Sequence, residues 1–181
     1  MKLVNNIVLN LLSHPTKSYR FRDVNTIDTI VIHQTDTEDR GAFSPYEIAQ
    51  YHVNSNDWPS IGYHYFVIED GTIYKTNDEN RITYHASGFN EKSLGVAITG
   101  LHRCNASDDN YQILNKEKYN ALVFILAKLS NKYNIDVNKV IGHTETGSPK
   151  SCPNLNMVQL RSDVEKKKFN FYSQRVLSLS Y

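Results

Sequence analysis

The sequence predicts a single α/β domain in which a central mixed β-sheet is flanked by α-helices. Three short apolar runs, at residues 28–33, 93–99 and 139–142, are typical of buried strands. Segments with a helical pattern, at 44–56 and 116–133, alternate with these runs, which favours one sheet covered by helices. A chain of 181 residues is long enough for one domain with a substantial core and short for two.

The first residues predict an amphipathic helix that lies on the domain. Asparagines interrupt the apolar stretch and no small-residue cleavage site follows it, so we do not interpret it as a signal peptide. A membrane-surface helix is the weaker alternative, because the polar face carries asparagines where such helices carry lysines. No stretch is long enough to span a bilayer. The residues that recur at helical spacing are Leu3, Val4, Ile7, Val8, Leu11 and Leu12.

Local signals define the elements in the middle of the chain. Ser44 as N-cap, Pro45 at the first helical position and Glu47 three residues after the cap predict a helix start. Within 62–76, the pair Asp70-Gly71 predicts the turn of a β-hairpin, because both residues tolerate the positive φ of a tight turn.

The second half of the chain predicts two further helices. Residues 116–133 are apolar on most faces, which predicts a central helix. A closing helix is expected to begin at Asn156. The last segment, 169–181, is aromatic and alternating, a pattern compatible with an added edge strand.

Composition excludes several classes of function. The formal net charge is +1, which argues against nucleic-acid binding through a basic field and against strong attraction to anionic lipid. Two cysteines are too few for a disulfide scaffold. Cys104 and Cys152 are therefore expected to be thiols in a reducing compartment.

Two histidines follow predicted strands, and a cysteine lies close by in a proline-stiffened loop. His33 ends the first apolar run, His143 follows the last, and Cys152 comes nine residues later. Two imidazoles and one thiolate suit Zn²⁺, and a three-ligand site with an open fourth position is typical of catalysis. Spacing alone leaves a surface or hydrogen-bonded role open, since the chain has seven histidines.

Four stretches resemble, in order, the zinc-dependent N-acetylmuramoyl-L-alanine amidases of the type 2 amidase and peptidoglycan-recognition family. They are "IVIHQTDT", "GYHYFVIEDGTIYKT", "YHASGFNEKSLGVAITG" and "IGHTETGSPKSCPN". The likeness is greatest to the single-domain phage lysozyme-amidases, the endolysins. We expect an N-terminal amphipathic helix and lead-in at 1–24, an amidase catalytic domain at 25–168, and a C-terminal extension at 169–181, which is either part of the same domain or a tail.

The resemblance implies roles for particular residues. His33, His143 and Cys152 would hold one Zn²⁺ per chain. Lys150 would stabilise the negative charge of the tetrahedral intermediate, and Tyr63 would donate to that oxygen or pass a proton to the leaving amine. On the residues alone, a solvated loop charge is the favoured interpretation of Lys150, and a core tyrosine in a strand is the alternative for Tyr63.

Other polar residues of the motifs receive weaker assignments. The resemblance makes His85 and Asn90 substrate-binding, although a turn-forming asparagine is an equal alternative for Asn90. His64 should point away from Tyr63 as a packed or hydrogen-bonded histidine. Glu145 is a possible base, with a solvated carboxylate the favoured interpretation.

The resemblance implies hydrolysis of the amide bond between N-acetylmuramic acid and L-alanine of peptidoglycan. The expected substrate is peptidoglycan or a muropeptide, and the protein is expected to be a monomer without a nucleic-acid partner. It would be made in the cytoplasm without a signal peptide and reach the wall after holin-type release. One alternative is a non-catalytic peptidoglycan-binding module, which typically lacks the third ligand. The other is a cytoplasmic wall-recycling amidase, which usually has aspartate where this chain has Cys152.

Overall fold

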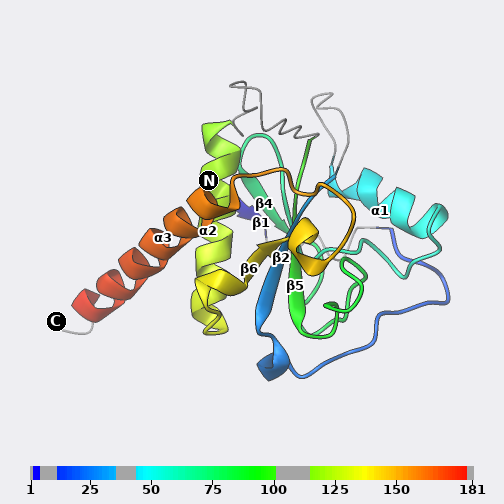
Figure 1. Cartoon of the computed structure of the whole chain (residues 1–181). Coiled ribbons are helices and arrows are strands. Elements are labelled where there is room, and N and C mark those ends of the chain that lie inside the picture. The colour runs from blue at the N-terminus through cyan, green and yellow to red at the C-terminus, as the bar shows by residue number, and fades with distance from the viewer. Residues whose placement is uncertain (1, 5–11, 36–43, 101–114, 179–181) are drawn as a thin grey trace.

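One mixed sheet organises the molecule (Figure 1). The computed structural model describes residues 2–4, 12–35, 44–100 and 115–178. Within these ranges six strands lie in the order β1-β4-β3-β5-β2-β6. Only β3 and β4 pair antiparallel, and the other neighbours are parallel. The strands are β1 (Lys2–Val4), β2 (Thr29–Gln34), β3 (Tyr65–Val67), β4 (Thr72–Lys75), β5 (Ser93–Ile98) and β6 (Val140–Gly142).

Helices cover both faces of the sheet, as the sequence predicts. Helices α2 (Lys116–Lys132) and α3 (Met157–Ser178) lie together on one side, and α1 (Pro45–Asn54) lies on the other (Figure 1). Short 3-10 turns occur at Val24–Thr26, Val137–Lys139 and His143–Thr146. None of the described helices combines the length and the apolarity needed to cross a membrane.

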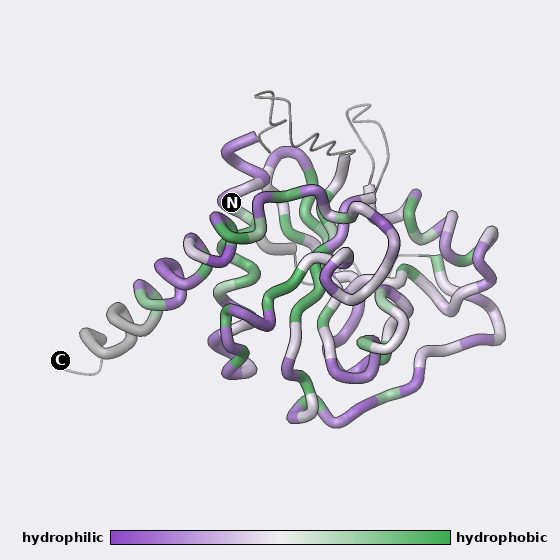
Figure 2. Tube along the Cα trace, in the orientation of Figure 1, coloured by the Kyte–Doolittle hydropathy of each residue, from purple (hydrophilic) through white to green (hydrophobic). Residues whose placement is uncertain are grey.

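The two faces of β2 and β5 pack against different helices, α2 on one side and α1 on the other. Ile30 and Ile32 pack into the large apolar cluster beneath α2, so His33, the next residue, points to the α1 side. His33 pairs across the sheet with Ala97, which packs in the smaller cluster formed with α1. Figure 2 shows hydrophobic residues along the strands and largely hydrophilic ones over the outer loops. The sheet therefore buries one face completely and presents His33 on the other.

The local signals of the sequence have the expected structures. The Glu47 carboxylate accepts the Ser44 N–H at 2.7 Å, which closes the start of α1. Gly71 turns the β3–β4 hairpin with φ +77°, and a Cβ there would lie 2.8 Å from the Glu117 carbonyl oxygen. Glycine is therefore required twice over at this turn, for its backbone angle and for its lack of a side chain.

Two expectations for the chain ends are wrong. Lys2–Val4 forms strand β1, parallel to β4, in place of the start of a helix. Residues 5–11 of the predicted helix lie outside the described residues, and Leu12 is not helical. The outer edge of β4 offers unpaired backbone groups, and pairing with them replaces the helical bonds.

At the other end, α3 continues to Ser178, so 169–178 is helical and adds no edge strand. The ring of Phe171 packs edge-on against Phe124, with centroids 5.5 Å apart, whereas Phe169 is 70% exposed. The aromatic alternation thus reflects one residue facing α2 and one facing solvent. The helix also crosses the expected boundary at 168.

Candidate metal centre

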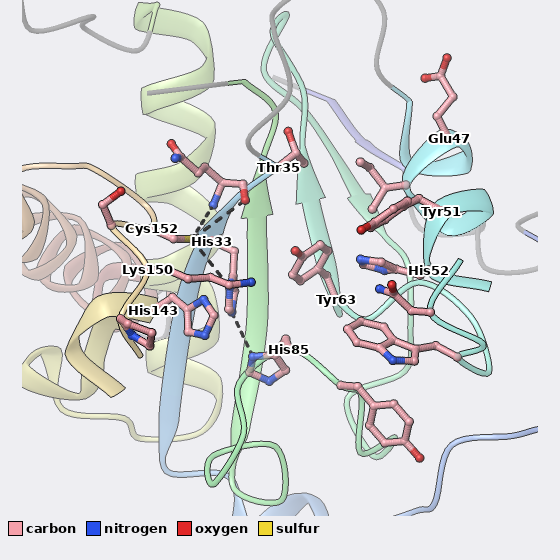
Figure 3. A pocket seen from close by; sticks show the side chains of 17 residues that line it. His33, Thr35, Glu47, Tyr51, His52, Tyr63, His85, His143, Lys150 and Cys152 are labelled. Atoms are coloured by element: carbon pink, nitrogen blue, oxygen red, sulfur yellow. Dashed lines mark hydrogen bonds between the residues drawn. The ribbon is translucent and has the colours of Figure 1, made fainter. Parts of the chain in front are cut away.

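A pocket of about 980 Å³ opens between α1 and the carboxyl-terminal ends of β2 and β6. It is lined by His33, His143 and Cys152. Lys150 reaches in from the side of His143 and Cys152, and Tyr63 lies on the other side of His33, toward α1 (Figure 3). All five residues that the sequence predicts as metal-binding or catalytic therefore line one cavity.

Strand register brings the two histidines together. Ile32 of β2 pairs with Gly142 of β6. Because the strands are parallel, the next residues lie at the same edge of the sheet: His33 near the end of β2, and His143 directly after β6. Their ring centroids are 4.6 Å apart. The Cys152 Sγ lies 4.0 Å from His33 Nδ1, and one donor atom from each of the three residues lies within 4.8 Å of the others.

The loop that carries Cys152 is tied back to the turn at His143. The Thr144 N–H donates to the Cys152 carbonyl at 2.8 Å. Gly142 can carry no side chain, since a Cβ would lie 2.7 Å from Pro153 Cδ. The chain thus reverses between His143 and Cys152 and returns the thiol to the imidazoles.

The carboxylate of Glu145 stabilises this turn. It accepts the Gly142 N–H at 2.7 Å and pairs with the Arg161 guanidinium at 2.6 Å. The favoured expectation of a solvated carboxylate is only partly right, because both oxygens are engaged. This geometry gives Glu145 a structural task and directs its oxygens to the backbone and to Arg161.

The donor set fits Zn²⁺. Burial, and then the charges of His143 and Lys150, hold the pKa of His33 well below its usual range, so its imidazole is neutral and keeps a lone pair. The Gln34 N–H donates to Cys152 Sγ at 3.2 Å, which favours a thiolate. A tetrahedral zinc ion needs nitrogen and sulfur donors about 3.6 Å apart, slightly less than the 4.0 Å observed.

Tyr63 and Lys150 are placed beside this cluster. The Tyr63 ring centroid lies 5.2 Å from that of His33. Burial, reinforced by Cys152, raises the pKa of Tyr63, so the phenol keeps its proton at neutral pH. Lys150 points into the pocket beside His33 and His143 (Figure 3), and its charge lowers the pKa of both histidines.

His85 and Asn90 lie behind the metal cluster. His85 is only 8% exposed, and its Nδ1 and Nε2 lie 3.1 Å from His33 Nε2 and 3.2 Å from Ser93 Oγ. The Asn90 side-chain oxygen accepts the His85 and Ala86 N–H groups at 3.0 and 2.8 Å. This is the turn-forming geometry that was the alternative for Asn90, and substrate contact by either residue stays a prediction.

Sequence reasoning missed the aromatic residues that line the pocket on the α1 side. They are Trp58, Tyr84, Tyr51 and His52. The His52 ring packs between Trp58 and Tyr63, with centroids 4.6 and 5.5 Å away. The only available signal was that the single tryptophan lies in a polar stretch, "SNDWPS".

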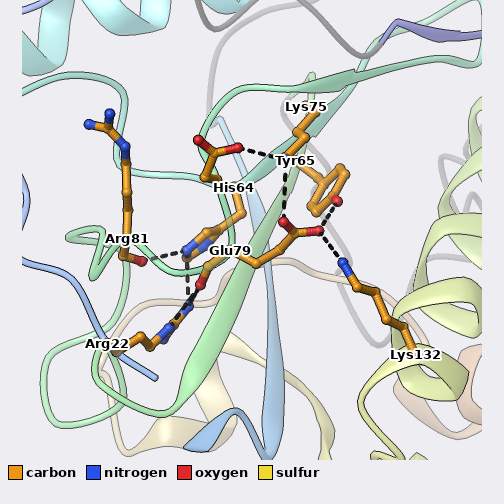
Figure 4. Close-up of polar contacts among 8 residues, drawn as sticks. Arg22, His64, Tyr65, Lys75, Glu79, Arg81 and Lys132 are labelled. Atoms are coloured by element: carbon orange, nitrogen blue, oxygen red, sulfur yellow. Dashed lines mark hydrogen bonds and ion pairs between the residues drawn. The ribbon is translucent and has the colours of Figure 1, made fainter. Parts of the chain in front are cut away.

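A buried polar network supports the segment that carries His85 (Figure 4). The Arg22 guanidinium donates to the carbonyls of Glu79, Asn90 and Ser93 at 2.8–2.9 Å and so holds the two ends of this segment together. His64 is fully buried. Its Nδ1 accepts the Gly95 N–H at 3.0 Å, and its Nε2 donates to the Arg81 carbonyl at 2.9 Å. This confirms the hydrogen-bonded role predicted for His64.

The buried histidines predict acid sensitivity. Burial lowers the pKa of His52 to about 4, and burial together with the Arg22 charge lowers the pKa of His64 to about 3. The unfolded chain takes up these protons near pH 6.5 and the folded chain does not, so stability is complete above pH 6.5 and falls as pH decreases. Between pH 7 and 5 we expect each histidine to cost about 2 kcal/mol of unfolding free energy.

Urea unfolding of the metal-free protein at pH 7, 6 and 5 measures this loss. An unfolding free energy that stays constant over this range would show that these rings gain protons in the folded state.

Comparison with known proteins identifies the family. The family described as N-acetylmuramoyl-L-alanine amidase matches residues 23–155. The chain is 29% identical to the endolysin of Escherichia phage T7 over 139 residues, which cover 76% of this chain and 87% of that protein. It is 28% identical to the endolysin of Enterobacteria phage T3 over the same shares. The chain belongs to the N-acetylmuramoyl-L-alanine amidase family and is a peptidoglycan-degrading amidase, as its motifs predict.

Solved structures agree on the fold. The Ph2119 endolysin from the Thermus scotoductus bacteriophage Ph2119 superimposes with a TM-score of 0.69 at 28% identity, over 90% of this chain and 99% of that one. Drosophila PGRP-LB gives a TM-score of 0.65 at 21% identity, over 89% of this chain and 93% of that one, and shares the fold. The predicted α/β fold with a central mixed sheet is confirmed.

Proposed function

We propose that this amidase is zinc-dependent, that it acts as a phage-type endolysin, and that His33, His143 and Cys152 hold its metal. The observation that carries the proposal is the convergence of two neutral imidazoles and a buried thiol in one pocket. Zinc bound there would supply a Lewis acid and make water a nucleophile near neutral pH. The bond cut is the amide between N-acetylmuramic acid and L-alanine.

In this reaction Lys150 stabilises negative charge and Tyr63 donates a proton. The Lys150 ammonium stabilises the negative charge that develops on the carbonyl oxygen. Tyr63 keeps its phenolic proton because it is buried, so it can donate to that oxygen or to the leaving nitrogen. Both side chains line the same pocket as the two histidines.

The pocket beyond the metal cluster suits an elongated, polar substrate. Its α1 side offers aromatic faces from Trp58, Tyr84 and Tyr51, which pack well on the apolar faces of sugars and on peptide backbone. The substrate is peptidoglycan or a muropeptide bound by a monomer. Synthesis in the cytoplasm followed by holin-type release fits the similarity to phage endolysins.

Cys152 weighs against the two alternatives. A non-catalytic binding module would be expected to lack the third ligand, whereas this chain has a buried thiol 4.0 Å from an imidazole nitrogen. A wall-recycling amidase would be expected to have aspartate at this position. The cysteine and the phage relatives together favour the endolysin.

Product analysis tests the proposal. Purified sacculi and a soluble N-acetylmuramoyl peptide are incubated with the zinc-loaded protein, and the products are analysed by mass spectrometry. We expect peptides with a free L-alanine amino group and glycans with a free lactyl carboxylate. Cleavage of a glycosidic bond, cleavage between two amino acids, or no cleavage by folded, zinc-loaded protein would contradict it.

Replacing Lys150 by alanine is expected to lower kcat on the same substrate about 10²-fold while zinc content is unchanged, because only charge stabilisation is lost. Lys128→Ala, an exposed lysine on α2, is the matched control and should leave kcat unchanged. A Lys150→Ala enzyme with full kcat would return this residue to the role of a solvated loop charge.

A further inference from the structure

The hydrogen bonds behind His33 allow only one placement of protons. The Ser93 hydroxyl lies 2.7 Å from the Phe89 carbonyl oxygen, which can only accept, so the hydroxyl donates its single proton there. The Ser93 Oγ must then accept from His85 Nε2 at 3.2 Å, and this nitrogen carries a hydrogen. The series of hydrogen bonds therefore starts from the Phe89 carbonyl oxygen, which can act only as an acceptor.

The hydrogen positions on both imidazoles follow from this assignment. Both rings are buried, with 2% of His33 and 8% of His85 exposed, which favours their neutral forms with one N–H each. With its hydrogen on Nε2, His85 has a bare Nδ1, which accepts from His33 Nε2 at 3.1 Å. His33 then has its lone pair on Nδ1, the nitrogen that faces Cys152 Sγ (Figure 3).

The position of the His85 ring is fixed by its surroundings. Gly95 of β5 lies against it, so closely that a Cβ there would be 2.7 Å from His85 Cγ. Asn90 accepts the His85 backbone N–H at 3.0 Å, and Arg22 holds the carbonyls of Asn90 and Ser93 at 2.8 Å each. Ring, backbone and flanking segment are all anchored, so the His85 Nδ1 acceptor stays in one place.

We infer that His85 is a positioning residue, which together with Ser93 holds His33 in the tautomer that presents Nδ1 to the metal. This role rests on the proposed metal site and differs from the substrate contact that the sequence predicts for His85. Partners of this kind orient a ligating imidazole and increase its basicity, and removing one typically weakens metal affinity about 10–100-fold.

Nuclear magnetic resonance of the wild-type chain tests the tautomers directly. In ¹⁵N-labelled protein, long-range ¹H–¹⁵N correlations distinguish a protonated ring nitrogen from a bare one. We expect His33 and His85 both to carry hydrogen on Nε2 and to have a bare Nδ1. A hydrogen on Nδ1 of either ring would overturn the inference, whether or not any variant folds.

Zinc affinity tests the positioning role independently of catalysis. Competition with a chelator should show that His85→Leu weakens zinc binding about 10–100-fold. His85→Asn places an amide oxygen near the Nδ1 position, so it should recover most of that affinity. Ser93→Ala removes the group that sets the His85 tautomer and should fall between these two variants.

Steady-state kinetics at saturating zinc separates the two roles of His85. We expect His85→Leu to show an unchanged KM for the muropeptide once zinc is saturating. A raised KM with unaltered zinc affinity would establish the substrate-binding role and overturn the inference. If the zinc affinities follow the expected order but no variant and no wild-type protein cuts peptidoglycan, the positioning role stands and the proposed function fails.

Discussion

Cys152→Ala is expected to abolish amidase activity and to remove bound zinc. Cys152 is the one anionic donor of the described cluster, and its loss leaves two neutral imidazoles, of which His143 is partly exposed. A bound metal ion typically stabilises the charge of the transition state by several kcal/mol, so loss of the metal should lower activity about 10³-fold or more. Zinc content by mass spectrometry and release of L-alanine amino termini, both measured on one sample, check the result.

Two further variants make this experiment decisive. Cys104→Ala removes the other cysteine, which the sequence does not predict to be a ligand, and should keep zinc and activity. Cys152→Asp retains an anionic donor and should keep part of the zinc affinity. Full activity in Cys152→Ala would mean that the thiol is a packing residue and that the cluster is not the amidase centre.

Tyr63→Phe is expected to lower kcat about 10²–10³-fold without loss of zinc, because it deletes a single donor hydroxyl beside the reacting group. The ring itself packs against Phe66 and His52, and phenylalanine preserves those contacts. Rates measured on a soluble muropeptide, together with thermal unfolding, separate a catalytic defect from a structural one.

Tyr74→Phe is the matched control for this variant, since Tyr74 packs on the same apolar cluster but is not among the pocket-lining residues of the described chain. It should retain the wild-type kcat. Equal rates for Tyr63→Phe and wild type would assign proton transfer to another group.

The sequence predicts the elements that local signals define. The Ser44-Pro45-Glu47 cap, the Asp70-Gly71 turn and the long apolar helix ending near Tyr133 all have the expected structures. Strand β1 could not be predicted in this way. Its spacing is compatible with a helix, and the partner that makes it a strand, β4, lies about 70 residues away.

The metal cluster could be predicted because its histidines lie at the ends of apolar strands. The residues around the cluster could not be predicted. His33 lies near the end of β2 and His143 follows β6, and parallel pairing brings such strand ends to one edge of the sheet. The bond between His33 and His85 joins residues 52 apart, and Trp58 reaches the pocket from the loop after α1. Contacts of this kind depend on tertiary packing and leave no periodic trace in the sequence.

The most direct test of the account is a zinc titration of metal-free protein with amidase rate and bound metal recorded together. The chain stripped with a chelator should be folded and inactive, and activity should rise linearly with added zinc until one equivalent per chain is bound. In the Cys152→Ala protein the same titration should restore neither tight binding nor activity. Full activity in the metal-free chain, or saturation of zinc binding without any amide hydrolysis, would contradict the assignment of His33, His143 and Cys152 as the catalytic metal site.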